Sequence, residues 1–178
     1  LVLVTLVILI AASLLYWGIQ SILLIRSMRA VPVLRVTPRD AHSDDPLVTV
    51  IVPARNEEAV LEPALRSRLQ DADPNLQFIF INDRSTDRTG AIMASVAEED
   101  HRVEYLEIES LPEGWLGKVH AMHVGFEAAA GSWILLSDAD VHVEPGVVRR
   151  TVEMAEHSDV DHLAAMPSIR TPSMGLRL

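Results

Sequence analysis

Residues 47–52 have the sequence Leu-Val-Thr-Val-Ile-Val, a short apolar run rich in β-branched side chains. Such a run predicts a strand that is buried on both faces. Similar runs recur along the chain, separated by stretches with apolar residues at helical spacing. We expect strands over 47–52, 76–81, 103–108, 133–136 and 160–166, and helices over 57–69, 87–99, 118–130 and 145–156. This alternation implies an α/β fold, an open and mostly parallel sheet with helices on both faces.

Residues with strong end preferences indicate where these helices begin and end. Ser85 or Thr86 is the expected N-cap of the second helix, because a hydroxyl oxygen can accept from the free N–H groups of the first turn. Gly131 is expected to close the third helix, since glycine adopts the left-handed conformation found after helix ends. Pro145 is expected in the first turn of the fourth helix.

The composition excludes several functional classes. The 178 residues include 15 Lys and Arg against 25 Asp and Glu, a formal net charge of −10. A duplex nucleic-acid binder needs an excess of cations, and aromatic residues, at 4%, are too few for a single-strand stacking platform. Without Cys, there is no disulfide framework, thiol catalysis or thiolate zinc site. The chain also lacks the GxSxG, Walker A and GxGxxG motifs of hydrolases, P-loop proteins and Rossmann oxidoreductases.

The first 25 residues contain no charged side chain. As a helix they would be about 37 Å long, enough to cross a hydrocarbon core of about 30 Å. A buried helix of a soluble protein would be shorter and carry a polar stripe. A signal peptide would show a basic start and a small-residue cleavage site, and neither is evident. We therefore expect a single transmembrane helix over residues 1–25.

Residues 26–46 are expected to form a basic, proline-rich linker, followed by a globular domain over 47–178. Arg26 and Arg29 follow the apolar segment directly, so the positive-inside rule holds the domain in the cytoplasm. Proline restricts φ and lacks an N–H donor, so neither a helix nor a strand runs through the linker. The linker prolines are Pro32, Pro38 and Pro46.

Polar residues gather after the predicted strands. The four clusters are Pro53–Glu57, Asn82–Asp87, Gly114–Lys118 and Asp138–Asp140, in the order of the strands that they follow. The carboxyl ends of parallel strands meet at one edge of a sheet, and ligands of open α/β sheets bind at that edge. The clusters therefore predict one shared binding site.

Asp138-Ala-Asp140 is the candidate metal site. Two carboxylates would repel a bound diphosphate unless a cation lay between them, and hard oxygen ligands suit Mg²⁺ or Mn²⁺. The spacing alone is not specific, because Asp71-Ala-Asp73 and Asp159-Val-Asp161 share it. Those two pairs, however, lie at the opposite edge of the predicted sheet. Helix N-capping is the alternative role for the Asp138–Asp140 pair.

The other candidate residues each have a functional and a structural interpretation. Asp83 could accept from a nucleobase N–H or simply shape its turn. Lys118 could bind phosphate as a point charge or be an ordinary solvated lysine. His142 could be a further metal ligand, although a loop histidine is the simpler role. His120 and His123, three residues apart, are expected to pack or be solvated rather than bind metal.

Three long stretches resemble the nucleotide-binding half of family-2 glycosyltransferases of the GT-A fold. They are VTVIVPARNEEAVLEPALRS over 48–67, FIFINDRSTDRTGAI over 78–92, and LPEGWLGKVHAMHVGFEAAAGSWILLSDADV over 111–141. The Gly-Trp-Leu-Gly-Lys element is similar to the membrane-bound branch that includes hopanoid-associated, carotenoid and ceramide glycosyltransferases. The resemblance covers residues 48–167 and is specific for the family, but not for a substrate.

The resemblance implies a nucleoside-diphospho-sugar donor, usually UDP-linked, and a role for each cluster. Pro53, Ala54, Arg55, Asn56 and Glu57 would line the nucleoside pocket. Asp83 would meet the uracil, and Lys118 would lie near the nucleotide phosphates. Asp138 would contact the nucleoside side, while Asp140 would bind the divalent metal.

The chain departs from the family pattern at its end. The family's catalytic base is an acidic residue in the acceptor half, often followed by an Arg-Trp element. Here Asp161 is the last carboxylate residue and no Arg-Trp pair occurs, so we expect the base downstream of Leu178.

We expect the donor half of a membrane-tethered, inverting glycosyltransferase with a lipid or polyprenoid acceptor. Two other classes remain open. One is a non-catalytic nucleotide-sugar-binding or scaffold domain. The other is a nucleotidyltransferase, which the missing Gly-rich phosphate loop disfavours.

Overall fold

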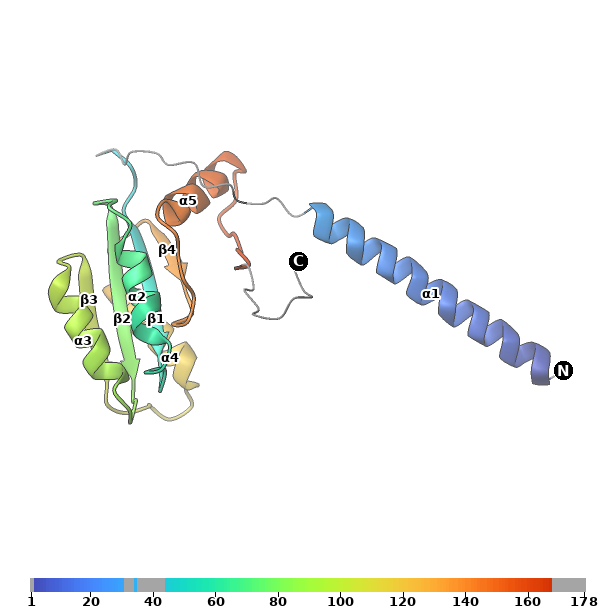
Figure 1. Cartoon of the computed structure of the whole chain (residues 1–178), viewed down its shortest axis with the longest axis horizontal. Coiled ribbons are helices and arrows are strands. Elements are labelled where there is room, and N and C mark those ends of the chain that lie inside the picture. The colour runs from blue at the N-terminus through green and yellow to red at the C-terminus, as the bar shows by residue number, and fades with distance from the viewer. Residues whose placement is uncertain (1, 31–33, 35–43, 168–178) are drawn as a thin grey trace. The chain divides into compact units, whose positions relative to one another are not determined.

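A computed structural model describes residues 2–30, 34 and 44–167 of the chain, which divides into the units 1–35 and 36–178 (Figure 1). The first unit contains helix α1 (Val2–Ala30). Its segment Val2–Ser27 is long and apolar enough to cross a membrane, judged by length and composition. Because α1 continues to Ala30, it extends into the segment that we predicted to be linker, most of which lies outside the described residues.

The second unit is built on a parallel sheet, which among the described residues has four strands in the order β3-β2-β1-β4. The strands are β1 (Val48–Ala54), β2 (Leu76–Asp83), β3 (Val103–Ile108) and β4 (Trp133–Leu136). Val50 of β1 pairs with Phe78 of β2 on one side and with Leu135 of β4 on the other. The chain therefore crosses over β1 to reach β4, so the strand order reverses between β1 and β4. This point of reversal is where open α/β sheets bind ligands.

Helices pack on both faces of the sheet, as predicted (Figure 1). They are α2 (Leu61–Leu69), α3 (Thr89–Glu99), α4 (Gly117–Ala128) and α5 (Val147–His157). Val50 and its even-numbered neighbours in β1 contribute to the core cluster that contains residues of α2, α3 and α5. Ile51, which points to the other face, contributes to a second cluster with Ala121 of α4. This alternation is the two-residue period of a strand buried on both faces.

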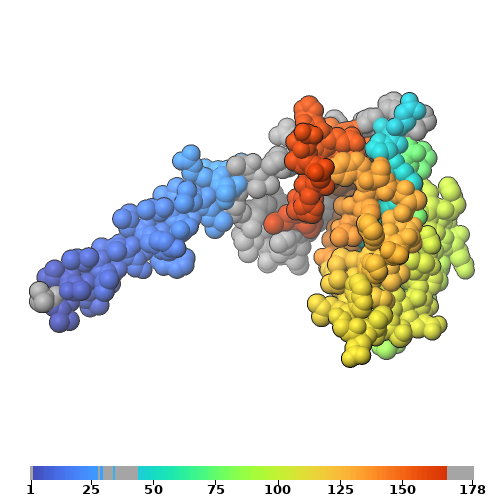
Figure 2. Space-filling model, turned by 180° about the vertical axis from the view of Figure 1, so that it is seen from behind, coloured from blue at the N-terminus to red at the C-terminus, as the bar shows by residue number. Residues whose placement is uncertain are grey.

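Among the described residues, α4 is the only helix in the second core cluster, and one side of it stays open to solvent. Leu116 and Phe126 are 74% and 60% exposed. Figure 2 shows α4 in yellow at the surface, next to the orange segment that contains β4.

Gly131 lies against β1 rather than closing α4, so our prediction for this residue was wrong. The helix ends at Ala128 with an extended Ala129. A Cβ on Gly131 would lie 2.6 Å from the backbone nitrogen of Thr49, while the Gly131 N–H donates to Thr49 Oγ1 at 2.9 Å. A glycine is needed here because the chain passes close to the backbone of β1.

The start of α3 also differs from the prediction. Neither Ser85 nor Thr86 caps this helix, which begins at Thr89, two residues later than predicted, with Arg88 at its N-cap position. The Arg88 N–H donates to Glu58 Oε2 at 2.9 Å. The Thr89 N–H, the first of the helix, donates to Asp87 Oδ1 at 3.0 Å, so both a nearby aspartate and the loop after β1 bond to this helix start.

Two predictions for the C-terminal part were wrong as well. Pro145 precedes α5, which starts at Val147 after Gly146 with a φ of 82°. The segment 160–166 forms no strand within the described part of the chain. Its side chains are mostly exposed, Met166 by 91%, so no core contacts hold it against the sheet.

Candidate functional site

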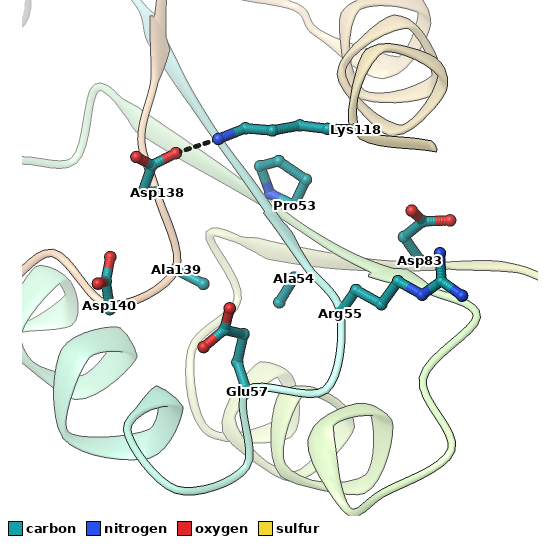
Figure 3. Close-up of a pocket in the computed structure, with 9 residues that line it drawn as sticks. All are labelled: Pro53, Ala54, Arg55, Glu57, Asp83, Lys118, Asp138, Ala139 and Asp140. Carbon is teal, nitrogen blue, oxygen red and sulfur yellow. Dashed lines mark hydrogen bonds and ion pairs between the residues drawn. The ribbon is translucent and has the colours of Figure 1, made fainter. Parts of the chain in front are cut away.

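A cavity of about 310 Å³ opens at the carboxyl edge of the sheet (Figure 3). Its lining residues come from the ends of β1, β2 and β4 and from the first turn of α4: Pro53, Ala54, Arg55, Glu57, Asp83, Lys118, Asp138, Ala139 and Asp140. Eight of these nine were candidates from the sequence, and the buried Ala139 is the addition. Asn56 and His142, the other two candidates, do not line it.

Asn56 joins the loop after β1 to the loop after β2. Its backbone has a positive φ of 56°, which asparagine tolerates better than most residues. Its Oδ1 accepts from the Thr86 N–H at 2.8 Å, and its own N–H donates to Ser85 Oγ at 3.1 Å. The next N–H, that of Glu57, donates to Thr89 Oγ1 at 2.8 Å. These bonds hold the cavity wall formed by residues 53–57.

Asp83 is almost fully buried at the end of β2, and its neighbour Arg84 pairs with it. Arg84 donates to the two carboxylate oxygens, from Nε at 2.7 Å and from Nη2 at 3.1 Å. These bonds raise the pKa of Arg84. Gly117 lies so close that a Cβ there would be 2.8 Å from Asp83 Oδ2. A carboxylate has about four acceptor positions, so Asp83 can still accept from a ligand N–H.

Lys118 contacts Asp138 across the cavity, with Nζ 2.5 Å from Oδ1 (Figure 3). Lys118 stands in the first turn of α4, whose N-cap residue Leu116 makes no side-chain cap bond. Free N–H groups and the helix dipole give this end of α4 a partial positive charge. A cation and a helix N-terminus side by side suit the binding of phosphate.

Asp138 and Asp140 directly follow β4, and both are exposed and line the cavity. No group of three or more His, Cys, Asp or Glu residues that could hold a metal ion by itself is found in the described ranges. Two carboxylates do fit a divalent cation whose other ligands are phosphate oxygens, the usual way in which proteins hold Mg²⁺. His142 is exposed and outside the cavity lining, so the structure does not bring it to the pair.

Arg68 is a buried cation behind the aspartate pair that sequence reasoning missed. It is 2% exposed in α2, and its Nη2 donates to the Asp138 carbonyl oxygen at 2.6 Å and to Ser137 Oγ at 3.0 Å. Burial lowers the pKa of Arg68 to about 10, while the nearby Asp140 carboxylate opposes the shift. The guanidinium is therefore still charged at pH 7. Its position, seven residues after the buried Leu61, was the available signal that it faces inward.

The other two Asp-x-Asp pairs do not line the cavity, although the strand that was to place Asp159 and Asp161 at the opposite edge does not form in the described residues. Asp71 and Asp73 are buried, and Asp71 Oδ2 accepts from the Gly146 N–H at 2.8 Å. Asp73 Oδ2 accepts from Arg149 Nε at 2.9 Å. This pair ties α5 to the amino edge of the sheet, whereas Asp159 and Asp161 are exposed.

The rings of His120 and His123 both contact the ring of Trp115. The ring of Trp115 stacks on His123 with centroids 5.0 Å apart and meets His120 edge-on at 5.3 Å. The packing role expected for the two histidines therefore agrees with the structure, and their contacts steady the loop that leads into α4.

The parallel sheet, its strand order and the cavity at the point of reversal define an open α/β domain with a ligand site at its switch point, and the matches below identify it as a domain of the GT-A class. The chain belongs to glycosyl transferase family 2, whose model matches residues 49–173. The fold class and the family resemblance predicted from the sequence are thus confirmed.

Named relatives agree with this membership. The glycosyltransferase EpsJ of Bacillus subtilis strain 168, whose function is uncharacterised, is 31% identical over 116 residues, which are 65% of this chain and 32% of EpsJ. The β-monoglucosyldiacylglycerol synthase of Nostoc sp. strain PCC 7120 is 28% identical over 160 residues, which are 85% of this chain and 34% of the synthase. The chain therefore spans about a third of the length of these relatives.

Among solved structures, the mannosyltransferase PcManGT of Pyrobaculum calidifontis, in complex with GDP-mannose and Mn²⁺, matches with a TM-score of 0.55 and 26% identity. The match covers 74% of this chain and 38% of that one.

Proposed function

We propose that this chain is the donor-binding half of a glycosyltransferase that uses a nucleoside-diphosphate sugar, with UDP as the nucleotide. The observation that carries the proposal is the cavity where Lys118 and the pair Asp138 and Asp140 meet at the carboxyl edge of the sheet. The family membership and the GDP-mannose bound to the Pyrobaculum relative support a nucleotide-sugar donor.

Each cavity residue has a role in this proposal. Residues 53–57 and the Asp83 carboxylate bind the nucleoside, with Asp83 accepting from a base N–H. Lys118 and the first turn of α4 attract the diphosphate. Asp138 and Asp140 hold a divalent cation, Mn²⁺ or Mg²⁺, together with the phosphate oxygens. When bound, such a cation stabilises the negative charge that develops on the leaving diphosphate.

We further propose a lipid-like acceptor, inversion at the sugar carbon, and a cytoplasmic catalytic domain anchored by α1. The length and hydropathy of Val2–Ser27 support an anchor. The relative from Nostoc, named as a synthase of a glucosyl diacylglycerol, is consistent with a lipid acceptor. An anchored domain works close to the surface in which such an acceptor resides.

Calorimetric titration of the full chain in detergent micelles with UDP and GDP, with and without Mn²⁺, tests the donor site. We expect Mn²⁺ to raise the affinity for UDP at least tenfold, and Asp140→Asn to abolish that gain because one metal ligand loses its charge. Asp161→Asn is the matched control, since Asp161 is exposed and outside the cavity. Equal affinities with and without Mn²⁺ in the unmodified chain would contradict the proposal. Asp71 is unsuitable as a control because it is buried and its carboxylate accepts from the Gly146 N–H.

An assay of the whole protein that carries this chain separates the alternative classes. Transfer of labelled sugar to a lipid extract with release of UDP supports a glycosyltransferase. Release of pyrophosphate would indicate a nucleotidyltransferase, and binding without turnover would indicate a scaffold.

A further inference from the structure

Helix α2 holds the segment that carries the aspartate pair at both ends. Arg68 donates from Nη2 to the Asp138 carbonyl oxygen at 2.6 Å and to Ser137 Oγ at 3.0 Å. The preceding residue, Ser67, accepts through Oγ from the Val143 N–H at 3.1 Å. Two adjacent residues of one helix thus bond to the beginning and to the end of the segment 137–143.

Arg68 is suited to fix this segment because its planar guanidinium is rigid and fully enclosed. Besides the bonds to the segment, Nη1 donates to the Ala64 carbonyl oxygen at 2.7 Å within α2. Because the side chain is 2% exposed, water screens its charge little, and that charge acts on Asp140 nearby. Arg66, two residues earlier, is by contrast exposed and paired with Glu99 and Glu62.

We propose that Arg68 is a positioning residue for the aspartate pair: it fixes the backbone at Asp138 and places a buried positive charge behind Asp140. This inference rests on the proposed function of the pair as the metal site. The segment that carries Asp138 and Asp140 is then held in place before a cation arrives, and the cation binds without reorganising it. Loss of Arg68 should therefore reduce metal-dependent nucleotide binding while leaving metal-independent binding unchanged.

Titration of UDP into the full chain in detergent micelles, with and without Mn²⁺, gives the ratio of the UDP affinity with metal to that without metal. If Arg68 only stabilised the fold, replacing it would not change this ratio in a folded variant. We expect Arg68→Met, which keeps the side-chain length, to lower this ratio at least tenfold with metal-free affinity unchanged. Arg68→Lys keeps the charge but loses the planar fork, and we expect an intermediate ratio. Arg66→Met, the matched control on the same helix, should keep the ratio of the unmodified chain.

Thermal unfolding of each variant shows whether it is folded. A folded Arg68→Met variant with an unchanged ratio overturns the inference. If Arg68→Met does not fold, Ser137→Ala decides, because it removes only one acceptor of Arg68: a drop of about threefold supports the inference, and no drop overturns it. If Mn²⁺ does not change the UDP affinity of the unmodified chain, the proposed function itself is contradicted. If Mn²⁺ raises the affinity equally in the unmodified chain and in Arg68→Met, only the inference about Arg68 is contradicted.

Discussion

The amino group of Lys118, at the start of α4, donates to the carboxylate of Asp138 after β4, with Nζ and Oδ1 2.5 Å apart. The side chains are 63% and 62% exposed, so water screens the pair and it adds little to stability. The bond bridges the cavity between the start of α4 and the segment after β4 (Figure 3). Under the proposed function, Lys118 exchanges this carboxylate for a phosphate group of the donor.

Lys118→Met should lower UDP affinity about tenfold, which corresponds to about 1.4 kcal/mol, because one phosphate partner is lost. The melting temperature should stay unchanged, since the ion pair is exposed. Calorimetric titration and thermal unfolding of the full chain measure the two effects. Arg150→Met, which removes an exposed ion pair with Glu153 on α5, should change neither. An unchanged UDP affinity in Lys118→Met would exclude Lys118 from the phosphate site.

Arg84 has a positive φ of 55°, a conformation that costs residues with a Cβ about 1 kcal/mol. Arg84→Gly should therefore be more stable than Arg84→Ala by about that amount, as both lose the ion pair with Asp83 equally. Denaturant midpoints of the two variants give the difference. If the Arg84→Ala variant is as stable as the Arg84→Gly variant, residue 84 does not adopt the left-handed conformation.

Asp100 should contribute stability that depends on pH. Hydrogen bonds from Arg102 hold the pKa of the Asp100 carboxyl below its usual value. The stabilisation is therefore complete above the unfolded-state pKa of about 3.9 and is lost as the pH falls through the lowered folded-state pKa. Asp100→Asn should reduce the melting temperature by about 4 °C at pH 7, and this deficit should shrink as the pH falls below about 3.9. Asp161→Asn is the control, and a deficit that does not shrink with falling pH would point to another cause.

Gly131→Ala should destabilise the domain by at least about 2 kcal/mol, because the new methyl group would overlap the backbone of β1. Gly114 offers a comparison, since it has a φ of 84° but a Cβ at this position would have no atom within 4 Å. Gly114→Ala should cost only about 1 kcal/mol of conformational strain. Equal losses in the two variants, measured by denaturant unfolding, would show that close packing at Gly131 is unimportant.

The α1 helix should anchor the full chain in membranes that are washed with carbonate. Replacing Leu9 and Leu14 together by lysine should release it, because each charge near the middle of a span costs about 3 kcal/mol. Leu116→Lys, on the exposed side of α4, should leave the chain in the membrane. A chain that is cleaved after α1, as seen by N-terminal sequencing, would indicate a signal peptide instead.

The sequence by itself was sufficient to predict the four strands of the sheet and the shared edge of the site, whereas the fifth predicted strand, 160–166, does not form in the described part of the chain. The bounds of β3 and β4 coincide with the predicted ranges 103–108 and 133–136. The central strands β1 and β2 are buried on both faces and need nearly continuous apolar side chains, so a short window of sequence reveals them. The clusters after the strands had to meet because parallel strands end at the same edge.

Only the tertiary structure decided which residues support the site. Arg68 donates to a carbonyl oxygen 70 positions further along the chain, and Asn56 bonds to Thr86 at a separation of 30. Glu58 likewise accepts from the Arg88 N–H, directly before α3, across 30 positions. A glycine is needed at position 131 because the chain there passes close to Thr49 in β1, 82 positions earlier, and not because of the helix that it follows. Such roles depend on which segments of the chain pack against each other. Burial of the whole core decides this packing, and a short stretch of sequence does not reveal it.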